Sequence, residues 1–214
     1  MKEILQQLSI NYTGNLQKNN LAILLSGGMD SIALAYWKKP AHSITIDYGQ
    51  KAANAEIKAA AQISKYLNIE HHILKVDCSA LGSGDMNGSK SLGISPITEW
   101  WPYRNQLLVT LACMKGVSIG IKELIIGSVS TDNAHKDGTR TFYDYLSKLI
   151  EYQEGQIKIT CPGIEMSTVD LIKKAKLPIS LLYWAHSCHT ANEPCMNCNG
   201  CKKYLYTLQM LGLD

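Results

Sequence analysis

The chain has 214 residues, which is enough for one domain with a sizeable core, or for one domain with a small appendage. Hydrophobic residues make up 46% and charged residues 18%, and this composition excludes a disordered chain. The net charge of +3 comes from scattered lysines and arginines and not from a dense basic stripe. Nucleic acid is therefore not an expected partner.

No apolar run approaches the ~20 residues needed to cross a bilayer, and residues 1–20 lack the apolar core of a secretory signal. We expect no membrane association and a cytoplasmic location. Most of the seven cysteines crowd together near the C-terminus, which favours metal binding in a reducing compartment over disulfides. The isolated Cys78, Cys113 and Cys161 are expected to be small core residues.

Strand and helix patterns alternate along the chain. The predicted strands are residues 21–25, 43–46, 70–76, 123–126 and 157–160, and the predicted helices are residues 31–37, 52–67, 107–115 and 142–152. This alternation predicts an α/β, Rossmann-like fold: a mostly parallel five-stranded sheet with helices on both faces and ligand sites at the carboxyl ends of the strands. Residues 79–96 are rich in Gly and Ser and predict a long loop, of the kind that forms lids or is disordered.

A glycine turn lies where the first strand ends and the first helix begins. Its two glycines let a ligand approach the backbone, and the amides that follow lie at the positive end of the helix dipole, so the turn suits an anion. Asp30 suits a magnesium ion held between it and a phosphate. A purely structural turn, with Asp30 or Ser31 capping the helix, is the alternative. The turn consists of Ser26, Gly27, Gly28, Met29, Asp30 and Ser31.

This six-residue string resembles the Ser-Gly-Gly-x-Asp-Ser signature of the PP-loop ATP pyrophosphatases. It lacks the Gly-Lys-Ser/Thr of a Walker loop. The resemblance implies that the turn grips the β- and γ-phosphates of ATP, that a nucleophile attacks the α-phosphorus, and that the products are an adenylate and pyrophosphate. It also implies an adenine nucleotide alpha hydrolase-like domain over residues 21–165, after an N-terminal extension at 1–20.

Near the C-terminus the cysteines follow the pattern C-x6-C-x2-C-x2-C. Two consecutive C-x-x-C turns and one further thiolate can surround a zinc ion at ~2.3 Å per bond and leave no open position, which predicts a structural site. An iron–sulfur cluster or a thiol-redox pair are alternatives, and His186 or His189 could replace a thiolate. We therefore predict a helical zinc-binding segment over residues 166–214, with the ligands Cys188, Cys195, Cys198 and Cys201.

The combination of turn and cysteines resembles the QueC family of 7-cyano-7-deazaguanine synthases, from about Leu21 to the end of the chain. Order and approximate spacing match over Ser26 to Ser31, Asp47-Tyr48-Gly49-Gln50 with Glu56, Pro102-x-Arg104-Asn105, Gly127 with Thr131-Asp132, and the C-terminal cysteines. Family members use ATP and ammonia to convert 7-carboxy-7-deazaguanine to the nitrile in queuosine biosynthesis. The resemblance implies an ATP-dependent carbon–nitrogen ligase with ATP, Mg²⁺ and Zn²⁺, and we expect a homodimer.

The resemblance also implies the site residues. Asp30, Arg104, Asp132 and Arg140 are predicted to be catalytic, and Asp47, Tyr48 and Gly127 are predicted to bind the nucleotide together with the glycine turn. Arginine suits a carboxylate or phosphate because its guanidinium offers paired donors. Without the resemblance, each residue has a structural alternative. Asp47 and Tyr48 could belong to an ordinary Asp-Tyr-Gly turn and Arg104 could be a surface arginine. Gly127 could form a simple turn and Asp132 could cap a helix.

The chain departs from the family pattern at two presumed substrate-binding stretches. Where the family has Tyr-Pro-Asp-Cys-Arg, this chain has residues 136–140 and keeps only Arg140; where the family has glycine, it has Tyr103. We therefore predict an altered substrate choice: Asp137 could read the same ring, or a larger acceptor could enter near Tyr103 and Lys136. Transfer of the acyl group to a protein amine, as in an antiviral defence system, and a tRNA-modifying PP-loop enzyme are the alternatives.

Overall fold

The computed structural model describes residues 20–95 and 97–213. Within them, five parallel strands form one sheet in the order β3-β2-β1-β4-β5. The strands are β1 (Leu21–Leu24), β2 (His42–Asp47), β3 (Glu70–Lys75), β4 (Glu123–Ile125) and β5 (Lys158–Thr160). Each strand lies at a position predicted from the sequence, and the α/β, Rossmann-like architecture is confirmed.

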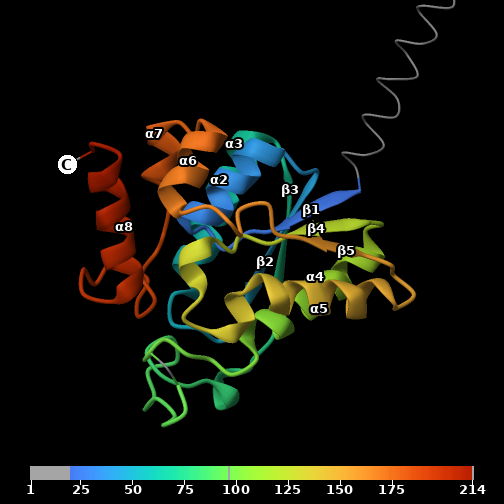
Figure 1. Ribbon diagram of the computed structural model, residues 1–214, viewed down its shortest axis with the longest axis horizontal. Helices are drawn as coiled ribbons and strands as arrows, with labels where there is room; N and C mark the ends of the chain where they lie inside the picture. Colours follow the sequence, from blue (N-terminus) through green and yellow to red (C-terminus); the bar gives the residue numbers. More distant parts are fainter. Residues whose placement is uncertain (1–19, 96, 214) are drawn as a thin grey trace, which may run out of the picture.

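Helices cover both faces of the sheet (Figure 1). The helices are α2 (Met29–Lys38), α3 (Ala53–Leu67), α4 (Arg104–Ser118), α5 (Arg140–Glu151), α6 (Thr168–Ala175), α7 (Ile179–Leu182) and α8 (Asn199–Met210), with short 3-10 turns at Ser79–Leu81, Ser130–Asp132 and Lys136–Gly138. None of the helices in the described ranges is long and apolar enough to cross a membrane.

Successive side chains of the central strand β1 point to opposite faces of the sheet and enter two separate apolar cores. Ala22 of β1 faces the core that contains α4 and α5, whereas Ile23 faces the core that contains α2, α3, α6 and α7. A strand buried on both faces reads as a continuous apolar run, which is why residues 21–25 predict a strand without polar alternation. Helices α6 and α7 share the second core, so part of the predicted C-terminal segment packs directly on the sheet domain.

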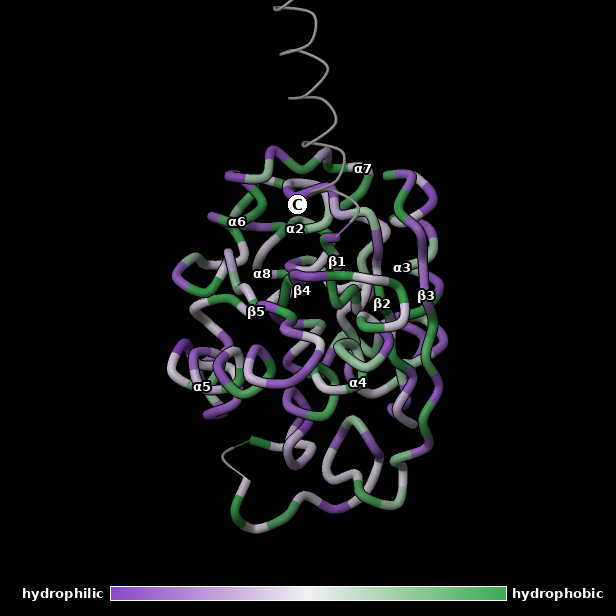
Figure 2. The backbone as a smooth tube through the Cα atoms, turned by 90° about the vertical axis from the view of Figure 1, so that its right-hand side faces the viewer, coloured by the Kyte–Doolittle hydropathy of each residue, from purple (hydrophilic) through white to green (hydrophobic). Residues whose placement is uncertain are grey.

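The segment between β3 and α4 extends beyond the helical layers, below them in Figures 1 and 2. Apart from the turn at Ser79–Leu81 it has no regular structure in its described residues, as its Gly- and Ser-rich composition predicts. It is nevertheless attached to the domain, because the backbone N–H of Lys51 donates to the carbonyl of Met86 over 2.9 Å. The predicted N-terminal extension lies outside the described residues except for Asn20.

Candidate active site and zinc centre

The carboxyl ends of β1, β2 and β4 open into a cavity of about 460 Å³, here called the strand-end cavity. Parallel strands with right-handed crossovers place ligand sites at this edge of a sheet. The segment between β3 and α4 contributes Met86 and Glu99 to its lining, and the C-terminal segment contributes His186 and Lys203. Parts of the chain that lie far apart in sequence therefore enclose one site.

The glycine turn contributes most of its residues to the lining of the strand-end cavity. Gly27 has a φ of +78°, and a Cβ there would lie 2.8 Å from both Ala59 Cβ and the Glu56 carbonyl oxygen, so only glycine fits against α3. The hydroxyl of Ser31 donates to the carbonyl of Gly28 over 2.9 Å and lies 3.2 Å from the hydroxyl of Ser26. These contacts fix the turn, and α2 begins immediately after Gly28.

Two carboxylates and one lysine meet beside the turn. Lys203 Nζ lies 3.0 Å from Asp30 Oδ2 and 3.0 Å from Asp132 Oδ1. Burial raises the pKa of Asp30 above its ordinary value, although attraction from Lys203 opposes the shift. Burial alone would lower the pKa of Lys203, but attraction from the two carboxylates outweighs it and raises that pKa. The lysine is therefore held in its charged form between two carboxyl groups.

One oxygen of this cluster remains without a partner. Asp30 Oδ1 is buried and has no hydrogen-bond partner among the described residues. A buried carboxylate oxygen without a partner is costly, and oxygen ligands are what Mg²⁺ prefers. Asp30 and Asp132 therefore fit a magnesium ion that would accompany a nucleotide.

Arg104, the first residue of α4, also lines the strand-end cavity. Its Nε donates to Asn105 Oδ1 over 3.2 Å, and Nη1 lies 3.0 Å from the sulfur of Met86. Among the described residues it forms no ion pair, so its charge is available to an anionic ligand. Asn105 donates from its side chain to the carbonyl of Asp137 over 2.8 Å and thereby holds the loop at 136–138 against α4.

Two further histidines line the cavity: His135 was not singled out from the sequence, and His189 was considered only as an alternative zinc ligand. His135 Nε2 and His189 Nδ1 are buried and have no hydrogen-bond partner among the described residues. Burial lowers the pKa of both rings, so both are neutral at neutral pH. Neutral imidazoles can pair with the polar edge of a heterocycle or accept a proton.

Glu99 is a further cavity residue that the sequence did not predict. It is only 5% exposed, which is unusual for a carboxylate. It accepts hydrogen bonds from the backbone N–H of Asn199 over 3.2 Å and from its side chain over 2.9 Å. It thus caps α8 and joins the two segments that enclose the cavity. A carboxylate directly before Trp100 and Trp101 was the available signal, because an acidic residue within an apolar stretch needs a partner.

The predicted site residues divide into two groups. Most of them line the strand-end cavity: Ser26, Gly28, Met29, Asp30, Ser31, Tyr48, Arg104, Gly127 and Asp132. Gly27, Asp47 and Arg140 are absent from its lining. Arg140 instead donates to Glu165 over 2.9 Å in an exposed ion pair, and it lines a separate surface hollow with Asp144. In the described residues Arg140 therefore pairs with Glu165 outside the strand-end cavity.

The structure shows where both departures from the family pattern lie relative to the strand-end cavity. Tyr103 has a φ of +56°, the left-handed conformation that favours glycine, and its side chain is 78% exposed. Neither Tyr103 nor Lys136 lines the strand-end cavity, whereas Asp137 does. Of the two predicted routes to an altered substrate choice, the geometry favours recognition by Asp137.

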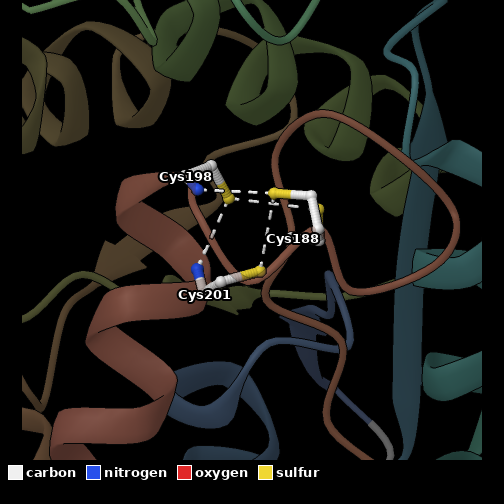
Figure 3. Close-up of side chains that lie close together, drawn as sticks. Cys188, Cys198 and Cys201 are labelled. Carbon is white, nitrogen blue, oxygen red and sulfur yellow. Dashed lines mark hydrogen bonds between the residues drawn. The ribbon is translucent and has the colours of Figure 1, made fainter.

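The sulfur atoms of Cys188, Cys195, Cys198 and Cys201 all lie within 4.8 Å of one another. Two of the pairs, Cys195 with Cys201 and Cys188 with Cys198, are 3.9 Å apart. A tetrahedron with Zn–S bonds of ~2.3 Å has edges of about 3.8 Å, so the arrangement fits a four-thiolate zinc site. Figure 3 shows three of these side chains converging from the start of α8 and the loop before it.

Hydrogen bonds prepare these sulfurs for metal. The backbone N–H groups of His189 and Cys201 both donate to Cys198 Sγ over 3.4 Å. Such donors stabilise a thiolate, which is the form that binds zinc. Together with the convergence of the four sulfurs, they show that the predicted zinc ligands fit the ion. His186 and His189 are not part of the cluster.

Comparison with known proteins identifies the family. The protein-family model described as "Queuosine biosynthesis protein QueC" matches residues 20–212 of the chain. The chain belongs to the QueC family. This membership makes the protein an ATP-dependent carbon–nitrogen ligase, as the resemblance in the sequence implied.

Named relatives cover most of this QueC protein. The 7-cyano-7-deazaguanine synthase 1 of Desulfitobacterium hafniense is 27% identical over 90% of this chain and 93% of its own length. The 7-cyano-7-deazaguanine synthase of Chlorobaculum parvum is 27% identical over 89% of this chain and 92% of its own length. A solved structure of an NMN synthetase from Francisella tularensis aligns with 100% of this chain and with 87% of its own chain. The identity is 15% and the TM-score is 0.45, which is too low to bear on function.

Proposed function

We propose that this QueC protein adenylates a 7-carboxy-7-deazaguanine-type carboxylate and that ammonia converts the product to the amide and then the nitrile. A carboxylate oxygen attacks the α-phosphorus of ATP, the α–β anhydride bond breaks, and pyrophosphate leaves with the bonding electrons. Ammonia adds to the acyl carbon, AMP leaves, and a proton is lost. A second ATP adenylates the amide oxygen with release of pyrophosphate, and loss of AMP and of both amide protons then gives the nitrile. The names of the relatives support this reading.

The glycine turn is the proposed phosphate site. Its amides and the hydroxyl of Ser26 offer donors at the start of α2, where the helix dipole favours anions. Mg²⁺ would be held by Asp30 and Asp132, and it would neutralise the negative charge of the phosphates. Lys203 keeps these two carboxylates close together and adds one positive charge where pyrophosphate would leave.

Arg104 is the proposed partner of the substrate carboxylate. Its guanidinium lies in the same cavity as the turn and has no carboxylate partner among the described residues, so it can orient a carboxylate toward the α-phosphorus. Asp137 and His135 offer an acceptor and a neutral ring nitrogen for the heterocycle. The neutral imidazole of His189 is the proposed acceptor of the proton that ammonia loses.

One observation carries the proposal: a single cavity is lined both by the glycine turn and by Arg104 with Asp137 and His135. The test supplies the purified protein with ATP, magnesium, ammonia and 7-carboxy-7-deazaguanine and follows all products by mass. Release of AMP and pyrophosphate that depends on the carboxylate, with amide or nitrile as product, is expected. Formation of ADP and phosphate would show that the chemistry is different.

The same assay separates the alternatives. Accumulation of the amide would place the departure from the family at the second adenylation. A mass adduct on a protein amine would favour the transfer reaction of a defence system over nitrile synthesis. The cytoplasmic location and the homodimer stay predictions, and the homodimer is checked by light scattering of the zinc-loaded protein.

A further inference from the structure

A second group of metal-ligating side chains lies at the opposite end of the sheet from the strand-end cavity. His42 is the first residue of β2, Glu70 is the first residue of β3, and His72 follows two positions later. One donor atom from each of the three lies within 4.8 Å of the others. None of these three residues lines the strand-end cavity, so the group is separate from the proposed catalytic site.

The distances within this group fit a single ion. His42 Nδ1 lies 3.2 Å from His72 Nε2 and 3.4 Å from Glu70 Oε2, and His72 Nε2 lies 3.6 Å from Glu70 Oε1. A tetrahedral zinc ion with bonds of 2.0–2.1 Å has donor-to-donor edges of about 3.3–3.4 Å. All three separations lie close to that value, although each imidazole faces a different oxygen of the carboxylate.

The backbone holds the three donors in place. In the parallel ladder of β2 and β3, the Cα of His42 is paired with that of Glu70, and the Cα of Ile44 is paired with that of His72. Side chains two residues apart on a strand point to the same face, so Glu70 and His72 both lie beside His42. The intervening His71 points to the other face, where its Nε2 lies 2.8 Å from Thr45 Oγ1.

Burial and charge also suit a metal site. The side chains of His42 and His72 are 14% and 12% exposed, whereas that of Glu70 is 65% exposed, which leaves a route for solvent and ions. Two partly buried imidazoles and one exposed carboxylate therefore offer an ion both protein donors and access to water.

A hydrogen-bonded histidine pair beside a surface glutamate is the alternative explanation. It accounts for the 3.2 Å contact between the rings, but only one proton can lie between the two nitrogens. It gives no reason for a carboxylate to approach both of these nitrogens at once. A shared cation accounts for all three contacts.

We propose that His42, Glu70 and His72 form a second metal site, which binds a divalent transition metal ion, zinc first, with water as the fourth ligand. Two histidines and one carboxylate are a common zinc donor set, and an open position distinguishes this site from the four cysteines. The ion joins β2 to the edge strand β3. It does not depend on the proposed reaction, since none of its ligands lines the strand-end cavity.

The test measures zinc and cobalt binding by the full-length protein. Protein already holding zinc at its cysteines is titrated with Zn²⁺ against a chromogenic chelator, and the total zinc is counted by elemental analysis. We expect a second equivalent in the wild type, weakened at least about 100-fold in His72→Gln and in His42→Gln. Co²⁺ added to the zinc-loaded protein should give visible d–d bands without thiolate charge-transfer bands, because only nitrogen and oxygen ligands remain.

His71→Gln is the matched control, because it removes a histidine from the same strand but from the other face. It should keep the second equivalent. The zinc count at the cysteines and the melting temperature establish that each variant is folded. The proposal is wrong if the wild type takes up one zinc only, or if the His42→Gln/His72→Gln double variant keeps the second equivalent.

Discussion

Lys203 Nζ lies 3.0 Å from Asp30 Oδ2, although 173 residues separate them in the chain. The same nitrogen reaches Asp132 Oδ1 over 3.0 Å, so one side chain of α8 holds two acidic groups, one from the first turn of α2 and one from the 3-10 turn after β4. Lys203 follows the last cysteine of the zinc cluster by two positions. The zinc segment therefore supplies the strand-end cavity with its central cation.

We predict that Lys203→Met lowers kcat/KM by roughly 10- to 100-fold, because a hydrogen bond from a charged donor contributes about 1.5–3 kcal/mol and the two from Lys203 hold the proposed magnesium ligands in place. Asp30 and Asp132 would then repel each other at the position where Mg²⁺ and pyrophosphate are expected. The measurement is steady-state pyrophosphate release at varied ATP and magnesium. Lys202→Met is the control, because the neighbouring lysine is exposed and does not line the cavity. Equal activity of the two variants would contradict the assigned role.

Removing the zinc is expected to abolish activity and to lower the melting temperature by roughly 10 °C or more, since structural zinc contributes several kcal/mol to folding. The cysteine segment carries Lys203 and also Asn199, whose cap by Glu99 closes the cavity. Cys198→Ser should behave like the chelated protein in calorimetry and in pyrophosphate release. Unchanged melting after complete chelation, confirmed by elemental analysis, would show that the cluster does not hold a structural metal.

The sequence predicts best the features that depend on neighbours in the chain. The apolar runs of the strands and the six-residue turn are local patterns, so the sheet and the phosphate site are predictable. Lys203 and Glu99 are not, because their roles come from contacts with residues 173 and 100 positions away. Arg140 is the opposite case, because a sequence motif predicts it to be catalytic whereas in the structure it pairs with Glu165; its catalytic role stays a prediction.

Alkaline pH should destabilise the protein through its buried thiols. Burial raises the pKa of Cys113 and of Cys161 to about 12, above the ordinary value of a thiol in the unfolded chain. A group whose folded pKa is raised stabilises the fold below its unfolded pKa, and this contribution is lost as pH rises toward the folded pKa. We therefore expect the free energy of unfolding to fall between about pH 9 and pH 12, by at most about 1.4 kcal/mol per pH unit for each thiol.

The measurement is urea unfolding of the zinc-loaded protein at several pH values from 8 to alkaline conditions. Cys113→Ala should start from a lower free energy of unfolding, because it loses core packing, and should fall less steeply with pH. A slope identical to that of the wild type would show that the Cys113 thiol ionises as readily in the fold as in the unfolded chain.

Tyr103 provides a test of whether the departure from the family pattern concerns the substrate or only the backbone. Its φ of +56° is unfavourable for a residue with a Cβ, by about 1–2 kcal/mol, and its side chain is 78% exposed, so little packing is lost on its removal. Glycine adopts this conformation freely but loses more entropy on folding, by roughly 0.5–1 kcal/mol. We expect Tyr103→Gly to stabilise the protein by about 0.5–1 kcal/mol in urea unfolding, whereas Tyr103→Ala keeps the strain and gains nothing. Because Tyr103 does not line the strand-end cavity, Tyr103→Gly should give the same ratio of amide to nitrile by mass spectrometry as the wild type. A changed product ratio in Tyr103→Gly would instead place this side chain over the acceptor when ligands are bound.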